Sequence, residues 1–538
     1  MSEVLKQPVV ASPDAPIAEG SLRSYFPAAL AVGGAVALTL LRIQAGGENF
    51  ISDGALMMLA LAAYLIAAVF YLTNLYAPST LFQKIGLWAA TAGVFFNLAS
   101  WCVRWVAGYD REYVIHMAQG TPMPWAFRYI PFANLYDLSL AFAFGAGITT
   151  LLIAHRPTFR FLGALSLPLA ALILILARFI GGELINLPPV LDSYWRPIHV
   201  GIAAISYGVA LVCFAVAVVY LLKDGVKTEA MAIWSSLFCL AVIGTISRGS
   251  VFTSGIYSAS TFVGNSRSSL PLRADIPYVG LLLVISGLLL AGVIVAFLVY
   301  LSRKDERARR WGHWLLKFSL IGQAAAVVTL VSQVKSITDV LSHIDTRQYE
   351  RFSVWMLKEE MTQARMPATM IQERVAQFSP QELYQMADQY VQQNGAALRL
   401  SLNANPVELA ALITCFAATL FCIIFSFRTE RLRESLPSLE KIDSLMYKTA
   451  GVAFAGLALL LMTGAVWANE SWGRYWGWDS KETGAFVAWL TYAGFLHTRI
   501  SRGWTGRPSA YFAIIAFLLV IFTYLGVSYL LPGLHSYA

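Results

Sequence analysis

The sequence predicts an all-α polytopic integral membrane protein, and three observations support this fold class. The 538-residue chain is 57% hydrophobic and only 13% charged, whereas soluble domains carry about 25% charged residues. Its mean hydropathy is +0.61. Apolar runs of about 20 residues, the length that a helix needs to span a bilayer, recur along the chain. The net charge of +8 therefore reflects loop topology and not a nucleic-acid partner.

About thirteen apolar segments are candidate membrane-spanning helices, and the segment 231–247 is the least distinct. In chain order the candidates are 25–43, 54–76, 85–107, 134–154, 159–182, 199–222, 231–247, 277–301, 314–334, 407–427, 448–468, 483–500 and 509–531. Lys and Arg concentrate in the loops 302–313, 428–448 and 499–507, which share one side if the segments alternate. Because positive loops stay cytoplasmic, we expect the N-terminus inside and the C-terminus outside.

Composition divides the chain into four parts. Residues 1–24 are a polar cytoplasmic tail without the apolar region of a signal peptide. Residues 25–222 and 439–538 form the two halves of a membrane core. Between them, 225–438 contains about four further spans and, at 336–406, a polar segment that predicts a small outer helical domain, with Ser379-Pro380 opening one of its helices.

Two remaining features give only local expectations. The stretch 248–276 is rich in Ser, Gly and Thr, so we expect a loop there. The five cysteines are scattered through apolar runs without a C-x-x-C pair, so packing is their expected role.

The stretch Trp472–Thr483 is the strongest candidate for a functional site. It packs Trp472, Trp476 and Trp478 together with charged residues between two apolar runs, on the side expected to lie outside. One interpretation is an interfacial aromatic belt. The density of aromatic rings instead favours a platform for a large planar ligand with carboxylate groups, such as haem b. Arg474, Lys481 and the more distant Arg196 could pair with those carboxylates, while Asp479 and Glu482 would orient the loop or cap the next helix.

Four of the seven histidines are candidate iron ligands, because haem iron is commonly held by His. His199 and His535 are expected at the level of the Trp-rich stretch and could bind one iron from opposite faces. His497 and His313 are expected at the inner boundary and could form a second haem site. The alternative for each is a helix-end residue bonded to backbone or water, or for His313 an interfacial anchor.

The motifs resemble one family of haem-handling proteins. The segment Trp467–Thr483 closely resembles the WWD signature, in the form found in the CcsA (ResC) family of System II cytochrome c biogenesis proteins. Pro131–Asp137, Ile442–Lys448, Leu496–Arg499 and Gly533–Tyr537 resemble other parts of that family. The resemblance covers about 85–222 and 440–538. Ser480 and Gly484 depart from it, because the family usually has Pro and Trp at these positions.

The resemblance implies a function and a location. Haem would be taken up on the cytoplasmic side at His497, with His313 as a hypothetical second ligand, and transferred to an outer site with His199 and His535 as axial ligands. There it would be joined to the C-x-x-C-H segment of apocytochrome c, as in a holocytochrome c synthase of the bacterial inner membrane whose WWD site faces the periplasm. The alternatives are a haem exporter or chaperone without ligase activity, and a quinone- or lipid-binding loop.

The resemblance also implies partners besides the lipid bilayer. These are apocytochrome c, thiol-reducing proteins that keep its cysteines reduced, and a ResB/CcsB-like membrane protein. The order of elements in 225–438, with three spans, an outer domain and one span, is like that of this last partner. This part of the chain could therefore replace some of the partner's function, or be an independent insertion.

Overall fold

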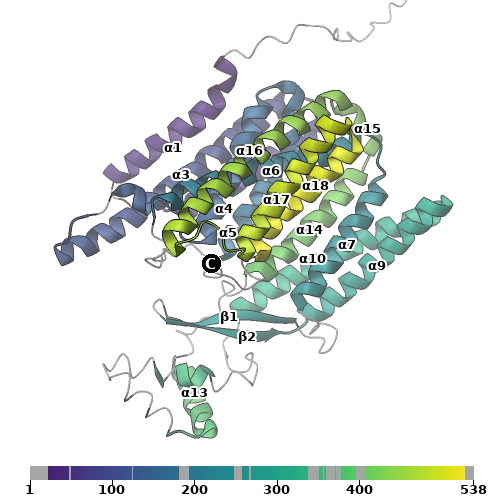
Figure 1. Cartoon of the computed structure of the whole chain (residues 1–538). Coiled ribbons are helices and arrows are strands. Elements are labelled where there is room, and N and C mark those ends of the chain that lie inside the picture. Colours follow the sequence, from purple (N-terminus) through teal and green to yellow (C-terminus); the bar gives the residue numbers. More distant parts are fainter. Residues whose placement is uncertain are drawn as a thin grey trace, which may run out of the picture.

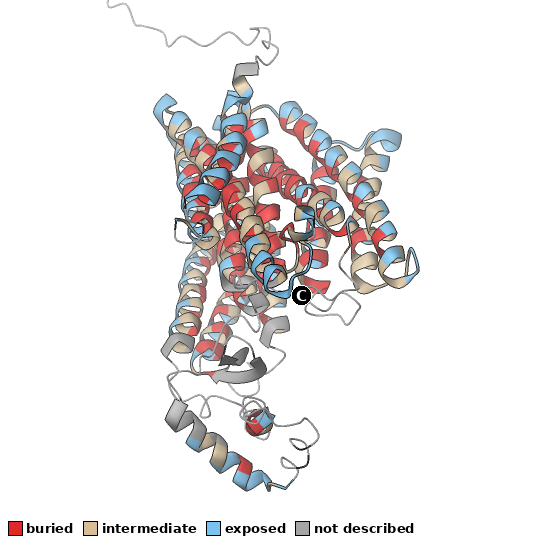
Figure 2. Cartoon of the chain, turned by 90° about the vertical axis from the view of Figure 1, so that its left-hand side faces the viewer, coloured by how far each residue is buried: buried red, intermediate tan, exposed pale blue. Residues whose placement is uncertain are grey.

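The computed structural model describes most of the chain as long helices (Figure 1). The residues it describes are 22–45, 47, 50–123, 125–180, 193–247, 257–265, 268–336, 351–355, 357–358, 370, 373, 377–394 and 406–527. Buried residues concentrate inside the helical bundle, and exposed ones lie on its outer faces (Figure 2). The all-α polytopic class predicted from composition is confirmed, and the protein is an integral membrane protein.

Two groups of helices have separate hydrophobic cores. The larger core joins α1 (Phe26–Gln44), α2 (Asp53–Tyr76), α3 (Thr80–Gln119), α4 (Leu135–Ala154), α5 (Gly163–Ile180), α6 (Trp195–Lys223), α16 (Leu439–Trp472), α17 (Ser480–Arg502) and α18 (Arg507–Ile521). The smaller core joins α7 (Thr228–Ser247), α9 (Val279–Arg303), α10 (Glu306–Ser336) and α14 (Pro406–Ser426). Helix α14 also packs against α5, and the short α15 (Thr429–Ser435) contacts α2.

Each of the thirteen predicted segments coincides with a described helix. Ten of the described helices are long and apolar enough to cross a membrane, and α14 with α15, bent by 85°, would make an eleventh. The helix α7 has only a shorter apolar stretch, Thr228–Gly244. This agrees with the expectation that 231–247 is the least distinct of the candidate segments. The helix α17 is not among the ten, because polar and charged residues occupy both of its ends. The number of spans and their orientation therefore stay predictions.

The part of the chain between α7 and α14 also contains strands. The strands β1 (Tyr257–Asn265) and β2 (Ser268–Ile276) form an antiparallel hairpin, with Tyr257 paired to Ile276. A loop was expected here, so this expectation was wrong for 257–265 and 268–276. Beyond the hairpin, α13 (Pro380–Asn394) lies apart from the bundle (Figure 1).

The start of α13 follows from its sequence. Ser379 donates its hydroxyl and its backbone N–H to the Glu382 carboxylate, at 2.8 and 2.9 Å. The Glu382 backbone N–H donates back to the Ser379 hydroxyl at 3.4 Å, which completes a capping box. Leu357 and Leu383 are buried and belong to one small cluster, separate from the cores of the bundle. The outer helical domain at 336–406 stays a prediction.

A buried ion pair fixes the beginning of α4 against α3. Arg104 on α3 donates to the carboxylate of Asp137, and both side chains are 2% exposed. The guanidinium also lies 3.4 Å from Asp53 at the start of α2 and 4.5 Å from the centre of the Tyr136 ring. Asp137 also accepts from the backbone N–H of Ala133 at 2.8 Å. One cation in the second half of α3 therefore holds together the starts of α2 and α4.

We predict that Arg104→Met lowers the stability of the detergent-solubilised protein by about 3–5 kcal/mol, because it leaves the Asp137 carboxylate buried without its cation. The measurement is the temperature at which half of the protein unfolds or aggregates. The double variant Arg104→Met/Asp137→Leu should recover most of the loss, because no buried charge then remains. A single variant as stable as the unmodified chain would contradict this account.

Candidate functional site

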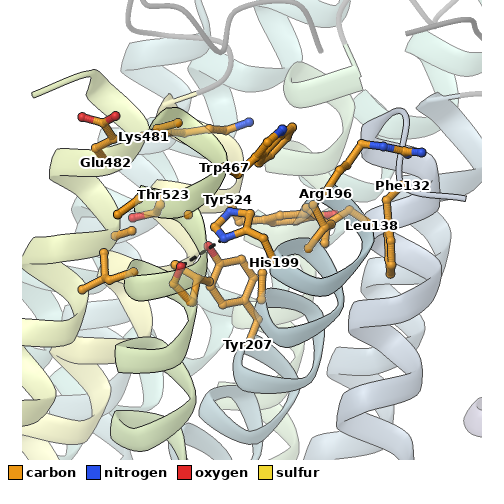
Figure 3. Close-up of a pocket in the computed structure, with 18 of the residues that line it drawn as sticks. Phe132, Leu138, Arg196, His199, Tyr207, Trp467, Lys481, Glu482, Thr523 and Tyr524 are labelled. Atoms are coloured by element: carbon orange, nitrogen blue, oxygen red, sulfur yellow. Dashed lines mark hydrogen bonds between the residues drawn. The ribbon is translucent and has the colours of Figure 1, made fainter. Parts of the chain in front are cut away.

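A cavity lies between α6, α16 and the turn that joins α16 to α17 (Figure 3). Its walls enclose about 1170 Å³ that no atom fills, including the part open to solvent. The small residues Ala203, Gly464, Ala465, Ala468 and Ala485 form part of its lining, so short side chains leave space between the helices there.

His199 of α6 projects into this cavity with a defined tautomer. Its Nδ1 lies 3.0 Å from the carbonyl oxygen of Leu460 on α16. A carbonyl oxygen can only accept, so Nδ1 carries the proton and Nε2 carries the lone pair. Metal-bound histidines are typically oriented in this way, through a hydrogen bond of the other ring nitrogen.

The position of the His199 ring depends on a glycine. A Cβ atom on Gly464 would lie 2.7 Å from Cε1 of His199, closer than van der Waals contact permits. Any larger residue at 464 would therefore displace the imidazole from the Leu460 carbonyl.

Tryptophan side chains form the wall above His199. Trp467, Trp472 and Trp476 line the cavity, and the Trp467 ring centre is 5.6 Å from that of His199. The indole N–H groups of Trp467 and Trp476 are buried and have no hydrogen-bond partner among the described residues. A buried N–H without a partner is costly, so these two donors suit a ligand with acceptor groups.

The turn that carries the tryptophans is held by Glu482. Its Oε2 accepts the backbone N–H groups of Gly477 at 2.8 Å and Asp479 at 3.1 Å. Between them, Trp478 has φ of +56°, a left-handed conformation that costs a bulky residue free energy. Asp479 is the N-cap of α17 and completes a capping box with Glu482. Both acidic residues therefore have the orienting and capping role expected from the sequence.

Lys481 supplies a positive charge at the cavity. It precedes the apolar part of α17 and lines the cavity beside Glu482 (Figure 3). Burial lowers the pKa of Lys481 to about 8, and the nearby Asp479 carboxylate opposes this shift. An anionic group of a ligand would restore the favourable environment of the ammonium.

The opposite wall is fixed by Arg196, which lies one turn before His199. Its guanidinium donates to the carbonyl oxygens of Arg128, at 2.6 Å, and Ile130, at 3.3 Å. These carbonyls belong to the loop whose next residues, Phe132 and Ala133, line the cavity. Arg196 therefore positions the loop. It also lines the cavity, so its pairing with ligand carboxylates stays a prediction.

Two tyrosines that the sequence interpretation did not select close the cavity floor. Tyr207 lies two turns after His199 on α6, and Tyr524 lies on the π-helical turn Phe522–Gly526. The Tyr524 hydroxyl is 2.5 Å from Ser139 Oγ on α4. The spacing 199–203–207 on one helical face is the signal that could have identified Tyr207. No local pattern predicts the π-helical turn that carries Tyr524.

Some predicted site residues lie elsewhere. Trp478 is 69% exposed and does not line the cavity, although its ring packs edge-on against Trp476 at 5.7 Å. Arg474 is also exposed, and its guanidinium folds over Gly477. His535, the expected second axial ligand, lies outside the described residues, so its role stays a prediction.

Gly484, a departure from the family pattern, contacts the π-helical turn. A Cβ atom on Gly484 would lie 2.9 Å from Oγ1 of Thr523 and 3.3 Å from Val527. The side chains of Thr523 and Val527 therefore fill the space that a larger residue at 484 would need.

The two candidate inner histidines lie on helices that belong to different hydrophobic cores. His497 is exposed on α17, which packs against α16 and α18, and its Nδ1 lies 3.5 Å from Ser501 Oγ. His313 is on α10, which packs against α9 and α14. Its Nε2 lies 3.4 Å from Glu229, a carboxylate that also pairs with Arg309 at 2.6 Å. A shared inner site for both therefore stays a hypothesis.

The fold and the cavity define a class of protein: an integral membrane helical bundle with a histidine and several tryptophans around a cavity at one end. The family described as "Cytochrome C assembly protein" matches residues 132–332 and 405–535. This is more than half of the chain, so the chain belongs to that family. The match extends into 225–438 and omits 333–404, which holds α13.

Relatives carry names that agree with this family. The chain is 56% identical over 98 residues to "Cytochrome c biogenesis protein CcsA" of Prochlorococcus marinus (strain MIT 9515), covering 18% of the chain and 31% of the relative. It is 52% identical over 99 residues to the protein of the same name from Guillardia theta, covering 18% of the chain and 33% of that relative. The alignments thus span about a third of each relative. The expected CcsA resemblance is confirmed and supports a role in cytochrome c biogenesis.

We predict that Glu482→Ala loosens the Trp-rich turn. Gly477 and Asp479 would lose their shared acceptor, and one hydrogen bond contributes roughly 1–1.5 kcal/mol. Hydrogen–deuterium exchange of these two amides should therefore accelerate by about tenfold. Thr483→Ala is the matched control, because it removes only a 3.4 Å contact to the Trp478 carbonyl. Equal exchange in both variants would argue against the bridging role of Glu482.

Proposed function

We propose that the chain binds haem b in the cavity and presents it on the outer side of the membrane for attachment to apocytochrome c. The observation that carries this proposal is the orientation of His199. Its Nδ1–H is held by the Leu460 carbonyl, so its Nε2 lone pair is suited to an axial position on iron.

The residues around His199 fit the rest of the ligand. Trp467, Trp472 and Trp476 offer apolar faces to a flat macrocycle. The ammonium of Lys481 suits a propionate, and the two buried indole N–H groups offer further donors. Membership of the cytochrome c assembly family gives this combination its functional context.

In the proposed reaction haem is the substrate together with the two thiols of a C-x-x-C-H segment. Each thiol S–H adds across one vinyl C=C, so a C–S bond and a C–H bond form while the S–H and π bonds break. No electrons are gained or lost overall, and the thiols must arrive reduced. The chain contributes by holding the macrocycle in one orientation, so that catalysis is mainly proximity.

We predict that His199→Gly removes the axial ligand and with it the low-spin haem spectrum of the purified protein. Added imidazole should restore the spectrum, because it can occupy the space left by the side chain. Co-expression with an apocytochrome c, in cells without their own maturation system, should yield holocytochrome from the unmodified chain and much less from the variant.

The outcomes of this experiment separate the candidate functions. An unchanged spectrum in His199→Gly would contradict the cavity as the haem site. A His199-dependent spectrum without any holocytochrome, with and without a ResB/CcsB-like partner, would favour the haem exporter or chaperone over the synthase.

We predict that haem affinity falls as pH rises above about 8. Burial lowers the pKa of Lys481 to about 8, and an anionic propionate would raise it. Below this pH the lysine is protonated and favours haem binding. Above it, the haem affinity falls by up to about tenfold per pH unit. Titration of the purified protein with haem at several pH values measures how the haem affinity depends on pH. Lys481→Arg should bind haem without this dependence, because arginine stays charged. A pH-independent affinity of the unmodified chain would contradict the role of Lys481.

A further inference from the structure

The turn from α9 to α10 concentrates positive charge. Between residues 303 and 310 the chain carries five cationic side chains and two acidic ones. Both acidic side chains are engaged locally, because Asp305 accepts the backbone N–H of Arg307 at 2.8 Å and Glu306 lies 3.6 Å from Arg309. This end of the smaller bundle therefore has an excess of positive charge.

The start of α7 adds a further cation to the same end. The ammonium of Lys227 lies 4.8 Å from the ring centre of Tyr300 on α9, and the guanidinium of Arg309 lies 5.3 Å from it. The buried carboxylate of Glu229 pairs with Arg309 at 2.6 Å and lies 3.4 Å from His313. One carboxylate therefore faces several cationic groups, and an added anion would lower their mutual repulsion.

The outer face of α10 combines two of the remaining cations with aromatic rings. Arg310, Trp311, Trp314, Lys317 and Phe318 are all exposed, and their spacing of three and four residues places them on one side of the helix. Lys317 Nζ lies 4.7 Å from the centre of the Trp314 ring, which stacks on Phe318 at 5.9 Å. The ammonium of Lys317 is thus turned back by one helical turn, toward Arg310. Among the described residues, neither Arg310 nor Lys317 forms a salt bridge.

We propose that this face of α10 is a binding site for an anionic phospholipid, whose phosphate is held by Arg310 and Lys317. Both side chains are suited to phosphate, and basic groups at the ends of membrane helices commonly bind anionic headgroups. Beyond Phe318 the exposed side chains of this helix are apolar, with Ile321 64% and Val328 65% exposed, so acyl chains can follow the same face. The site is separate from the cavity, because α10 belongs to the smaller hydrophobic core.

The test is native mass spectrometry of the purified full chain after incubation with phosphatidylglycerol or phosphatidylcholine. We expect the unmodified chain to retain several-fold more phosphatidylglycerol, and Arg310→Gln/Lys317→Gln to retain the two lipids equally. The exchange Arg310→Lys/Lys317→Arg should keep the preference, because it preserves both charges. Free glycerol 3-phosphate should not displace the lipid, because it has no acyl chains.

The matched control is Lys441→Gln/Lys448→Gln on α16. It removes two exposed cations with the same spacing, also on the side expected to be cytoplasmic. Glu440 and Asp443 lie among these lysines, and no tryptophan does, so this variant should keep the preference for phosphatidylglycerol.

Each other result would overturn the proposal. Equal retention of the two lipids by the unmodified chain would mean that no selective site exists. A preference that survives Arg310→Gln/Lys317→Gln would place the lipid elsewhere. An equal loss in the α16 control would indicate a general effect of surface charge. Displacement by glycerol 3-phosphate would indicate an anion site that does not select a lipid.

Discussion

The close packing of α6 between α4 and α16 is the constraint on which the rest of the structure depends. A Cβ on Gly208 would lie 2.3 Å from the backbone of Gly145 on α4, and one on Gly456 would lie 2.2 Å from Ser206 Oγ. Without these small residues the three helices could not approach so closely. This approach brings the Leu460 carbonyl to His199 and so decides which ring nitrogen carries the proton.

The two walls of the cavity are stabilised by different means. Glu482 holds the tryptophan wall by accepting two backbone N–H groups around a strained residue. Arg196 and the Arg104–Asp137 pair hold the opposite wall by binding the loop before α4 and the start of that helix. Charged side chains are therefore used on both sides to fix backbone. A rigid site suits a reaction in which orientation supplies most of the rate enhancement.

Lys481 differs from these charges because burial lowers its pKa. The ammonium lines the cavity, so an anionic group of a ligand there would restore its favourable environment.

The sequence by itself determined the fold class, the helices and the chemical character of the site. Apolar runs predict membrane spans, because a helix must be apolar over about 20 residues to cross the bilayer. Asp479 and Glu482 predict the start of a helix, because capping depends only on neighbouring residues. Tertiary structure decided which residues meet. Trp478 faces solvent while Trp467 lines the cavity, Arg196 binds backbone, and His313 pairs with Glu229 and not with His497. Such contacts depend on how helices distant in sequence rotate against one another, which no local pattern encodes.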